Sequence, residues 1–314
     1  MIENKNKFIQ EIIKDCTVVI TTFFAGNKLE NCIKKIPNYF KILIIDNGGE
    51  KEKKNYYENK FSNLTYFVSE ENLGVPRSYS LANKIVSTKY MFNTQPDVII
   101  KKNCIEELLS NVKKYPNFAI LSPTIYHNNL YLVEGDYRIL KIQNKKYMHH
   151  GKLKIHPSYN KPPDGDLTVD AVTGTAMLID RTKLELINDW DTNIFNYFED
   201  MDLCLRLRLK GFEIIKIRDA EVDHDPFSSH DIDFSKEMDF SRNWHYSWSN
   251  FYFLKKHTSV LNALKFGISL LFKSTIKSIF YFFFNKQKSA THFYKAYGVF
   301  FSILNLKPNY RPKI

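Results

Sequence analysis

Three carboxylates stand close together at the start of the segment EDMDLCLRLRLKGF, where Glu199, Asp200 and Asp202 precede a run of leucines and arginines. Neighbouring carboxylates repel one another, so such a cluster usually holds a cation, shares a proton or faces a substrate hydroxyl. A carboxylate within hydrogen-bond reach of a hydroxyl can remove its proton as a general base. We therefore treat this cluster as a candidate catalytic site. The alternative is an acidic helix start without chemistry.

Polar and aromatic side chains also stand at the ends of predicted strands. Thr22 and Phe23 end the first strand, Asp46 ends the second, and Asp97 follows the fourth. Ligands of open parallel sheets bind beyond the carboxyl ends of the strands. A hydroxyl, an aromatic ring and a carboxylate suit a nucleoside, and Asp97 could bind a metal ion through oxygen. Each residue taken alone could equally be a strand-end turn residue.

His224 lies between two aspartates in AEVDHDPF and is a candidate metal ligand, although a lone histidine is more often structural. The segment GNKLEN after the first strand matches neither the dinucleotide fingerprint nor the P-loop. A bound diphosphate would therefore need a metal ion and Arg77 as its counter-charges.

The elements that would position these residues alternate between strand and helix in the first part of the chain. Short apolar runs rich in β-branched residues predict strands, and the segments between them predict helices. Continuous apolar strands indicate a mainly parallel sheet covered on both faces. The strands are predicted at 17–23, 41–47, 64–70, within 90–100 and at 118–126, with helices at 28–36, 76–88 and 103–115.

The segment after Asp200 is ambiguous between strand and helix. Leucine alternates with polar residues, as in a strand, but the acidic residues stand at one end and the basic ones at the other, before Gly211. That charge order favours a helix, which a glycine can end, and we interpret the segment as one. The region 127–166 is irregular and predicts an insertion or flap. Further strands are predicted at 167–180, 212–217 and 220–222, with mostly helix from about 234 onward.

Composition indicates a folded protein, because 44% of the 314 residues are apolar and 25% are charged. The four cysteines are far apart and the N-terminal segment does not resemble a signal peptide, so we expect a reduced, cytoplasmic protein without a structural zinc site.

The net charge of +11 comes from one end of the chain, because 251–314 contains eleven basic and no acidic residues. Within it, 259–284 is very apolar but is interrupted by Lys265, Lys273 and Lys277. A helix of this pattern has lysines on one side and apolar residues on the other, which is typical of a helix lying on an anionic membrane surface. The alternative is a helix packed on the rest of the protein. The apolar runs fit a membrane better than nucleic acid, so we expect no nucleic-acid partner.

Taken together, these segments resemble glycosyltransferase family 2 with the GT-A fold, and especially its bacterial rhamnosyltransferase-like subgroup. The resemblance covers about residues 16–228. It rests on the segments VVITTFF, ILIIDNGG, ENLGVPRSYSLA, NTQPDV, VDAVTGTAMLIDR, FNYFEDMDLCLRLRLKGF and AEVDHD.

The resemblance implies an α/β fold with a GT-A-type, mainly parallel nucleotide-binding sheet flanked by helices, followed by a C-terminal helical region. The glycosyltransferase domain would span 12–228, and the basic amphipathic region 229–314. The activity implied is inverting transfer of a hexose or deoxyhexose from a nucleotide-diphosphate sugar to a glycan or lipid-linked acceptor, in bacterial surface polysaccharide synthesis. The protein would be peripheral to the inner face of the cell membrane.

The resemblance also implies roles for single residues. Asp200 would be the catalytic base, and Glu199 would orient the base or the acceptor. Independently of the resemblance, helix spacing indicates that Asp202 caps the helix or pairs with Arg206 one turn on. The donor nucleotide would contact Thr22, Phe23, Asp46, Arg77 and Asp97, a Mg²⁺ or Mn²⁺ ion would be held by Asp97 and His224, and the sugar pocket would include Gly174, Thr175 and Trp190.

The sequence departs from the family pattern at the expected metal site, because Gln95-Pro96-Asp97 offers one carboxylate where the family's DxD signature offers two. Two other functions stay open. A sugar nucleotidyltransferase would also use a nucleotide-binding α/β sheet, but it would typically have a glycine-rich basic loop after the first strand. A non-catalytic nucleotide- or glycan-binding relative is the second alternative.

Overall fold

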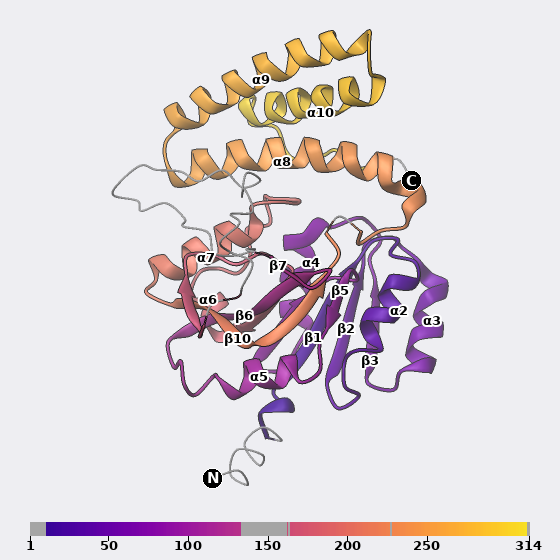
Figure 1. The fold of residues 1–314 in the computed structure, drawn as a ribbon, viewed down its shortest axis with the longest axis vertical. Coiled ribbons are helices and arrows are strands. Elements are labelled where there is room, and N and C mark those ends of the chain that lie inside the picture. The colour runs from indigo at the N-terminus through magenta and orange to yellow at the C-terminus, as the bar shows by residue number, and fades with distance from the viewer. Residues whose placement is uncertain (1–10, 133–161, 163, 227, 313–314) are drawn as a thin grey trace.

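The computed structural model describes residues 11–132, 162, 164–226 and 228–312. A twisted sheet with helices on both faces forms one part of the molecule, and three long helices form a layer above it (Figure 1). Most of the predicted insertion at 127–166 lies outside the described residues.

Within the described residues the sheet has ten strands, and its main path runs in the order β3-β2-β1-β4-β9-β6-β10-β5. β1, β2, β3 and β4 pair in parallel, whereas β9 lies antiparallel between β4 and β6. The strands are β1 (Cys16–Thr22), β2 (Lys41–Asp46), β3 (Leu64–Val68), β4 (Tyr90–Thr94), β5 (Val98–Ile100), β6 (Phe118–His127), β7 (Leu130–Leu132), β8 (Leu167–Val169), β9 (Ala176–Asp180) and β10 (Glu213–His224).

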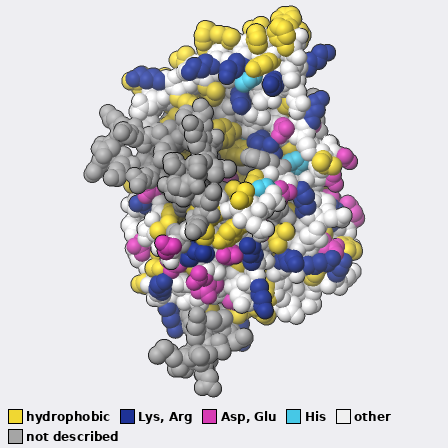
Figure 2. Space-filling model, in the orientation of Figure 1, with side chains coloured by type: hydrophobic (Ala, Val, Ile, Leu, Met, Phe, Trp, Pro, Cys, Tyr) yellow, Lys and Arg dark blue, Asp and Glu magenta, His cyan; other side chains and the backbone are white. Residues whose placement is uncertain are grey.

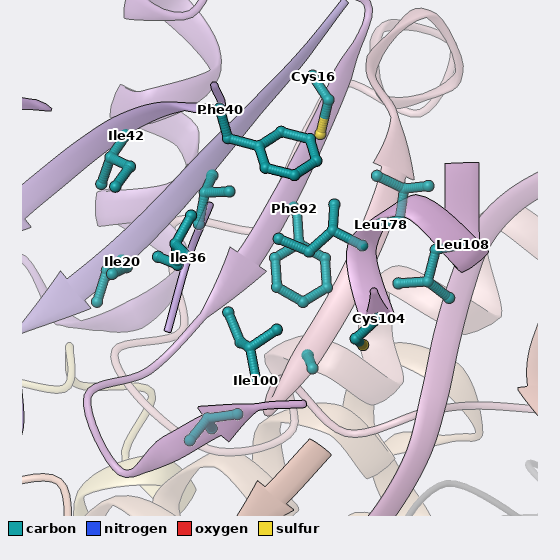
Figure 3. Close-up of a cluster of buried hydrophobic side chains, with 14 of the residues drawn as sticks. Cys16, Ile20, Ile36, Phe40, Ile42, Phe92, Ile100, Cys104, Leu108 and Leu178 are labelled. Atoms are coloured by element: carbon teal, nitrogen blue, oxygen red, sulfur yellow. The ribbon is translucent and has the colours of Figure 1, made fainter. Parts of the chain in front are cut away.

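Alternating side chains of the strands build a core on each face of the sheet. Val18 and Ile20 of β1 belong to one hydrophobic cluster, and Val19 belongs to the other. Figure 3 shows part of the first cluster, which includes Phe92 and Leu108. α2 (Asn27–Ile33), α3 (Lys51–Lys60) and α5 (Cys104–Ser110) cover the first face, whereas α4 (Gly74–Ile85), α6 (Arg181–Glu185) and α7 (Glu199–Leu209) cover the second.

The segment after Asp200 is the helix α7, as predicted. Asp202 also pairs with Arg206 as expected, with 2.7 Å between carboxylate oxygen and guanidinium nitrogen. The fully buried Asp202 carboxylate also contacts Lys256 at 2.5 Å and His257 at 2.7 Å. Both residues lie at the end of the long helix Ser235–His257.

The C-terminal region is helical, as predicted, with α8 (Ser235–His257), α9 (Val260–Phe282) and α10 (Lys286–Ile303) after the short turn η2 (Ile232–Phe234). The helices pack around a small cluster that includes Phe251, Ala263 and Val299. α10 approaches α8 closely because Gly298 faces the backbone of Trp244, where a Cβ would overlap the carbonyl. No helix in the described part of the chain is long and apolar enough to cross a bilayer.

Candidate active site

A pocket of about 300 Å³ lies at the carboxyl ends of the central strands, between the sheet and α8. Its walls come from the ends of β1 and β10, the β4–β5 connection, the approach to β9, and the first turn of α7. The residues predicted for the site that line it are Thr22, Phe23, Asp97, Gly174, Thr175, Glu199, Asp200 and His224.

Asp200 is held in the first turn of α7 by two backbone amides. Its Oδ2 accepts a hydrogen bond from Gly174 N at 3.0 Å, and its Oδ1 accepts one from Met201 N at 2.7 Å. Amide donors and the positive end of a helix dipole both favour the ionised carboxylate. The preceding residues Tyr197 and Phe198 both have φ of +67°, which is uncommon outside glycine and is often found at functional sites.

Glu199 has the opposite environment, although it is the next residue. It is buried, and its Oε2 has no hydrogen-bond partner among the described residues. Burial, followed by the neighbouring Asp200 charge, raises the pKa of Glu199 well above its usual value. Burial therefore favours the protonated form of Glu199, whereas the amides and the helix start favour the ionised form of Asp200, and such a division of roles is found in many acid–base sites.

Asp97, just before β5, and His224, at the end of β10, meet at the pocket at the same end of two neighbouring antiparallel strands. His224 Nε2 lies 3.7 Å from Asp97 Oδ2, and the buried Asp97 Oδ1 has no hydrogen-bond partner among the described residues. A carboxylate and an imidazole suit Mn²⁺ or Mg²⁺ if a bound diphosphate supplies further oxygens. The described residues contain no group of three His, Cys, Asp or Glu that could hold a metal ion without such help. The residues present therefore fit a cation shared with a ligand.

The end of β1 carries a second open polar group, because the buried Thr22 Oγ1 has no partner among the described residues. Asp46 lies at the end of the neighbouring β2, but its carboxylate accepts hydrogen bonds from the amides of Gly48 and Glu50, each at 2.8 Å. Burial raises the pKa of Asp46. Its side chain thus shapes the turn after β2, and the next residue, Asn47, lines the pocket.

Besides Asp46, two more residues predicted for the site, Arg77 and Trp190, lie outside the pocket lining. Arg77 forms an ion pair with Glu71 at 2.5 Å, with both side chains partly exposed. Trp190 is buried in the second core cluster, and its ring lies 5.2 Å from that of Tyr79. Trp190 does not line the pocket, because its indole ring packs against Tyr79 of α4 in the core.

One part of the wall that sequence reasoning missed comes from the C-terminal region. Met238, Ser241 and Arg242 of α8 line the pocket, as do His230 before the helix and Pro312 after α10. These residues carry no local motif, and only the packing of the helical layer over the sheet brings them to the pocket. Asn72 and Asn196 were also missed.

Comparisons with known proteins agree with this geometry. Residues 17–181 match Glycosyl transferase family 2. The chain is 22% identical, over 232 residues and 71% of each chain, to the low-salt glycan biosynthesis hexosyltransferase Agl10 of Haloferax volcanii.

Two solved structures share the fold at low sequence identity. The mannosyltransferase PcManGT from Pyrobaculum calidifontis, in complex with GDP-Man and Mn²⁺, has a TM-score of 0.52 at 10% identity, covering 93% of this chain and 87% of that one. GalNAc-T7 with UDP, GalNAc and Mn²⁺ has a TM-score of 0.51 at 14% identity and covers 67% of this chain, which spans 43% of the GalNAc-T7 chain. Because the family match covers more than half of its residues, the chain belongs to glycosyl transferase family 2 and is a glycosyltransferase with a GT-A-type α/β fold.

Proposed function

We propose that the protein is an inverting hexosyl- or deoxyhexosyltransferase. It would use a nucleoside-diphosphate sugar and a hydroxyl of a glycan or lipid-linked glycan, in the assembly of a bacterial surface polysaccharide. The rhamnosyltransferase-like subgroup stays a prediction within this proposal. The relatives described above support a nucleotide-sugar donor, since one is a hexosyltransferase and one was solved with GDP-Man.

The observation that carries the proposal is the environment of Asp200. Two backbone amides fix its carboxylate at the pocket wall, and the neutral Glu199 stands beside it. A fixed, ionised carboxylate facing a pocket is suited to remove a proton from a hydroxyl. The same pocket offers the buried polar atoms Thr22 Oγ1 and Asp97 Oδ1, which have no partner among the described residues and suit a nucleotide.

In the proposed reaction these residues have the following roles. Asp200 takes the proton of the acceptor hydroxyl while the oxygen of that hydroxyl bonds to the anomeric carbon of the sugar. The bond from that carbon to the diphosphate oxygen breaks on the opposite face, so the configuration inverts. The protonated carboxyl of Glu199 can donate a hydrogen bond that orients the acceptor. Positive charge developing on the sugar resembles that in glycoside hydrolysis.

Asp97 and His224 would hold a divalent cation at the diphosphate. When bound, such an ion stabilises the negative charge on the leaving group. The Mn²⁺ in both structural relatives supports this assignment.

The test is a panel of UDP-, GDP- and dTDP-sugars with glycan acceptors, scored for release of nucleoside diphosphate with Mg²⁺ or Mn²⁺. Acceptor-dependent release and an inverted anomeric product would support the proposal. Formation of a nucleotide sugar from a nucleoside triphosphate and a sugar phosphate would instead indicate a nucleotidyltransferase. Nucleotide binding without any turnover would indicate the non-catalytic alternative.

We also propose that 251–314 rests on the inner, anionic face of the cell membrane. Apolar side chains at a helical spacing are exposed on the outer side of α9, including Leu261, Ile268 and Phe272. Lys265, Lys273 and Lys277 are exposed on the same helix. Figure 2 shows apolar side chains at this end of the molecule, next to Lys and Arg side chains. Within this proposal, 12–228 is the glycosyltransferase domain and 229–314 is the membrane-facing helical region.

A further inference from the structure

The segment Leu306–Pro312, which follows α10, is fixed along α8 by specific contacts. Trp248 donates its indole N–H to Leu306 O at 2.9 Å, and His245 Nε2 lies 2.9 Å from Tyr310 O. Burial lowers the pKa of His245 to about 3, so the ring is neutral and its Nε2–H donates to this carbonyl. The Tyr310 ring stacks on Trp244 at 5.9 Å. These contacts fix the position of the segment relative to α8.

This arrangement returns the chain to the rim of the pocket. Pro312 lines the pocket, and the Arg311 guanidinium lies 3.8 Å from the ring centroid of Phe195, another lining residue. Phe195 also stacks on His245 at 4.4 Å. Arg311 Nη1 donates to the carbonyls of Pro308 and Tyr310, at 2.9 and 2.8 Å. These contacts hold the guanidinium in one position, which limits the entropy that Arg311 would lose when it binds an anion.

The charge of Arg311 is not neutralised by an ion pair with a carboxylate among the described residues. Burial lowers the pKa of Arg311, Glu71 raises it and Arg77 lowers it, so the three side chains lie within range of one another's charges. Glu71 is already paired with Arg77. An arginine stays protonated under these conditions, so this rim carries a net positive charge.

Among the described residues, the pocket lining has little other positive charge to offer an anion. Its lining residues include the carboxyls of Asp97, Glu199 and Asp200 but one arginine, Arg242. Arg242 is ion-paired with Asp239 at 2.5 Å. Arg311, which lies on the ring of the lining residue Phe195, has no carboxylate ion-pair partner among the described residues and is therefore available to a phosphate at this side of the pocket. Guanidinium groups bind phosphate through paired, charge-assisted hydrogen bonds.

We propose that Arg311, presented by the segment Leu306–Pro312, binds a phosphate group of a substrate at the pocket rim. The phosphate belongs either to the nucleotide donor or to a lipid-linked acceptor, and the same guanidinium chemistry serves both. The inference rests on the proposed transferase function for the identity of the substrates, but the site itself can be tested by binding alone.

The experiment compares the full-length protein with Arg311→Ala by isothermal titration. The probes are UDP, GDP and dTDP with Mn²⁺, the matching nucleosides, and farnesyl diphosphate added after the nucleotide. If the donor supplies the phosphate, Arg311→Ala should weaken binding of the nucleoside diphosphate about tenfold or more and leave the nucleoside unchanged. If the acceptor supplies it, farnesyl diphosphate should lose affinity by a similar factor while the nucleotide does not.

Two further variants separate phosphate binding from structure and from net charge. Arg311→Lys keeps the charge but loses the planar fork, so it should recover only part of the affinity. Lys307→Ala removes an exposed cation of the same segment and should bind all probes like the parent. Unchanged affinity of Arg311→Ala for every diphosphate, an equal loss in Lys307→Ala, or an equal loss for nucleosides would overturn the proposal. Because binding needs no turnover, failure of the transferase assay would leave this test readable.

Discussion

Asp200 and Glu199 show how neighbouring residues of one type acquire different chemistry. The helix start and two amides favour the charge on Asp200, whereas burial beside that charge favours the protonated form of Glu199. Neither the amide contacts of Asp200 nor the burial of Glu199 can be read from the dipeptide Glu-Asp in the sequence. Tyr197 and Phe198 have a strained backbone with positive φ, and the two carboxyl side chains that follow them, Glu199 and Asp200, both line the pocket.

Asp200→Asn should lower the rate of sugar transfer by about 10² to 10⁴, because the amide cannot accept the proton of the acceptor hydroxyl. Nucleotide binding should stay close to that of the parent, since Asp200 faces the donor nucleotide less than Thr22 or Asp97 do in the proposed arrangement. Steady-state kinetics and titration with the nucleoside diphosphate measure the two effects.

Glu199→Gln is the matched control, because it makes the same carboxyl-to-amide change one residue away. The amide imitates the protonated Glu199, so we expect a much smaller loss of rate than in Asp200→Asn. The opposite order of the two variants would identify Glu199 as the base.

Donor binding should depend on a divalent cation. Removing the cation with EDTA should weaken binding of the nucleoside diphosphate and leave binding of the nucleoside unchanged, because only the diphosphate shares the ion with Asp97 and His224. Asp97→Asn and His224→Ala should each raise the Mn²⁺ concentration needed for half-maximal activity. Full activity in excess EDTA would show that arginines alone balance the diphosphate.

The sequence predicted the strand-end residues of the site better than the residues around them. Thr22, Asp97 and His224 line the pocket because strand ends gather at one edge of a sheet, and their roles there stay predictions. Asp46, predicted by the same argument, instead accepts hydrogen bonds from the turn after β2. Arg77 and Trp190 could not be placed, since the orientation of a helix surface and the packing of an indole depend on tertiary contacts. The contributions of α8 and of the segment after α10 come from far along the chain and have no local pattern.

At the scale of elements, Asp202 joins the catalytic helix α7 to α8. Its buried carboxylate contacts Arg206, Lys256 and His257. Burial raises the pKa of Asp202, but the His257 hydrogen bond and the charges of Arg206 and Lys256 outweigh it and lower the pKa to about 2. An unfolded aspartate titrates near 3.9, so this carboxylate contributes on the order of 2 kcal/mol of stability above that pH.

Asp202→Asn should therefore destabilise the protein by about 3 kcal/mol at pH 7, because it removes the buried carboxylate that Arg206, Lys256 and His257 share, although Lys256 keeps its ion pair with Asp191. The direction of this pH dependence follows because the pKa of Asp202 is lower in the folded protein than in the unfolded chain. The stability from Asp202 is complete above about pH 4 and is lost as the pH falls towards 2. Urea unfolding of parent and variant between pH 7 and pH 3 measures the difference, which should narrow below pH 4. A difference that does not depend on pH would exclude this ionic contribution.

Gly298→Ala tests the close packing of α10 on α8. An alanine in a helix is usually more stable than a glycine by roughly 0.5–1 kcal/mol. Here the added Cβ would overlap the Trp244 carbonyl, so the two backbones must separate. We expect a net destabilisation of about 1–3 kcal/mol by overpacking. Gln287→Ala, at an exposed position of α10, is the control and should change stability little. A more stable Gly298→Ala would show that the helices are not in close contact.

The elements themselves were largely predictable where their patterns were strong. The apolar runs gave the strands β1, β2, β3 and β6, and charge order correctly favoured a helix for α7 over its alternating leucines. α3 was not predicted, because its sequence KEKKNYYENK is highly polar and buries only Tyr57. The antiparallel position of β9 between β4 and β6 is a matter of topology, which strand patterns do not contain.

At the scale of the molecule, charge and apolar surface are concentrated in the helical layer. The basic residues of 251–314 have no acidic counterpart in that region. Phe272 and Ile279 of α9 are 66% and 62% exposed, and Phe283 after it is 76% exposed. An apolar stripe bordered by lysines gains free energy from two sources at an anionic bilayer, burial of apolar area and about 1 kcal/mol per nearby cation.

The protein should therefore float with vesicles that contain anionic lipid, and less with neutral vesicles or at high salt. Replacing Leu261, Phe272 and Ile276 together with serine should clearly weaken flotation, because it removes three exposed apolar side chains of the stripe without touching the buried side of α9. The control is Ile232→Ser, which removes another exposed apolar side chain outside α9, and it should float like the parent. Equal flotation of the triple variant, or no flotation of the parent, would contradict membrane binding. The stripe would then be a surface for another protein, because exposed apolar area of this extent is unfavourable in water without a partner.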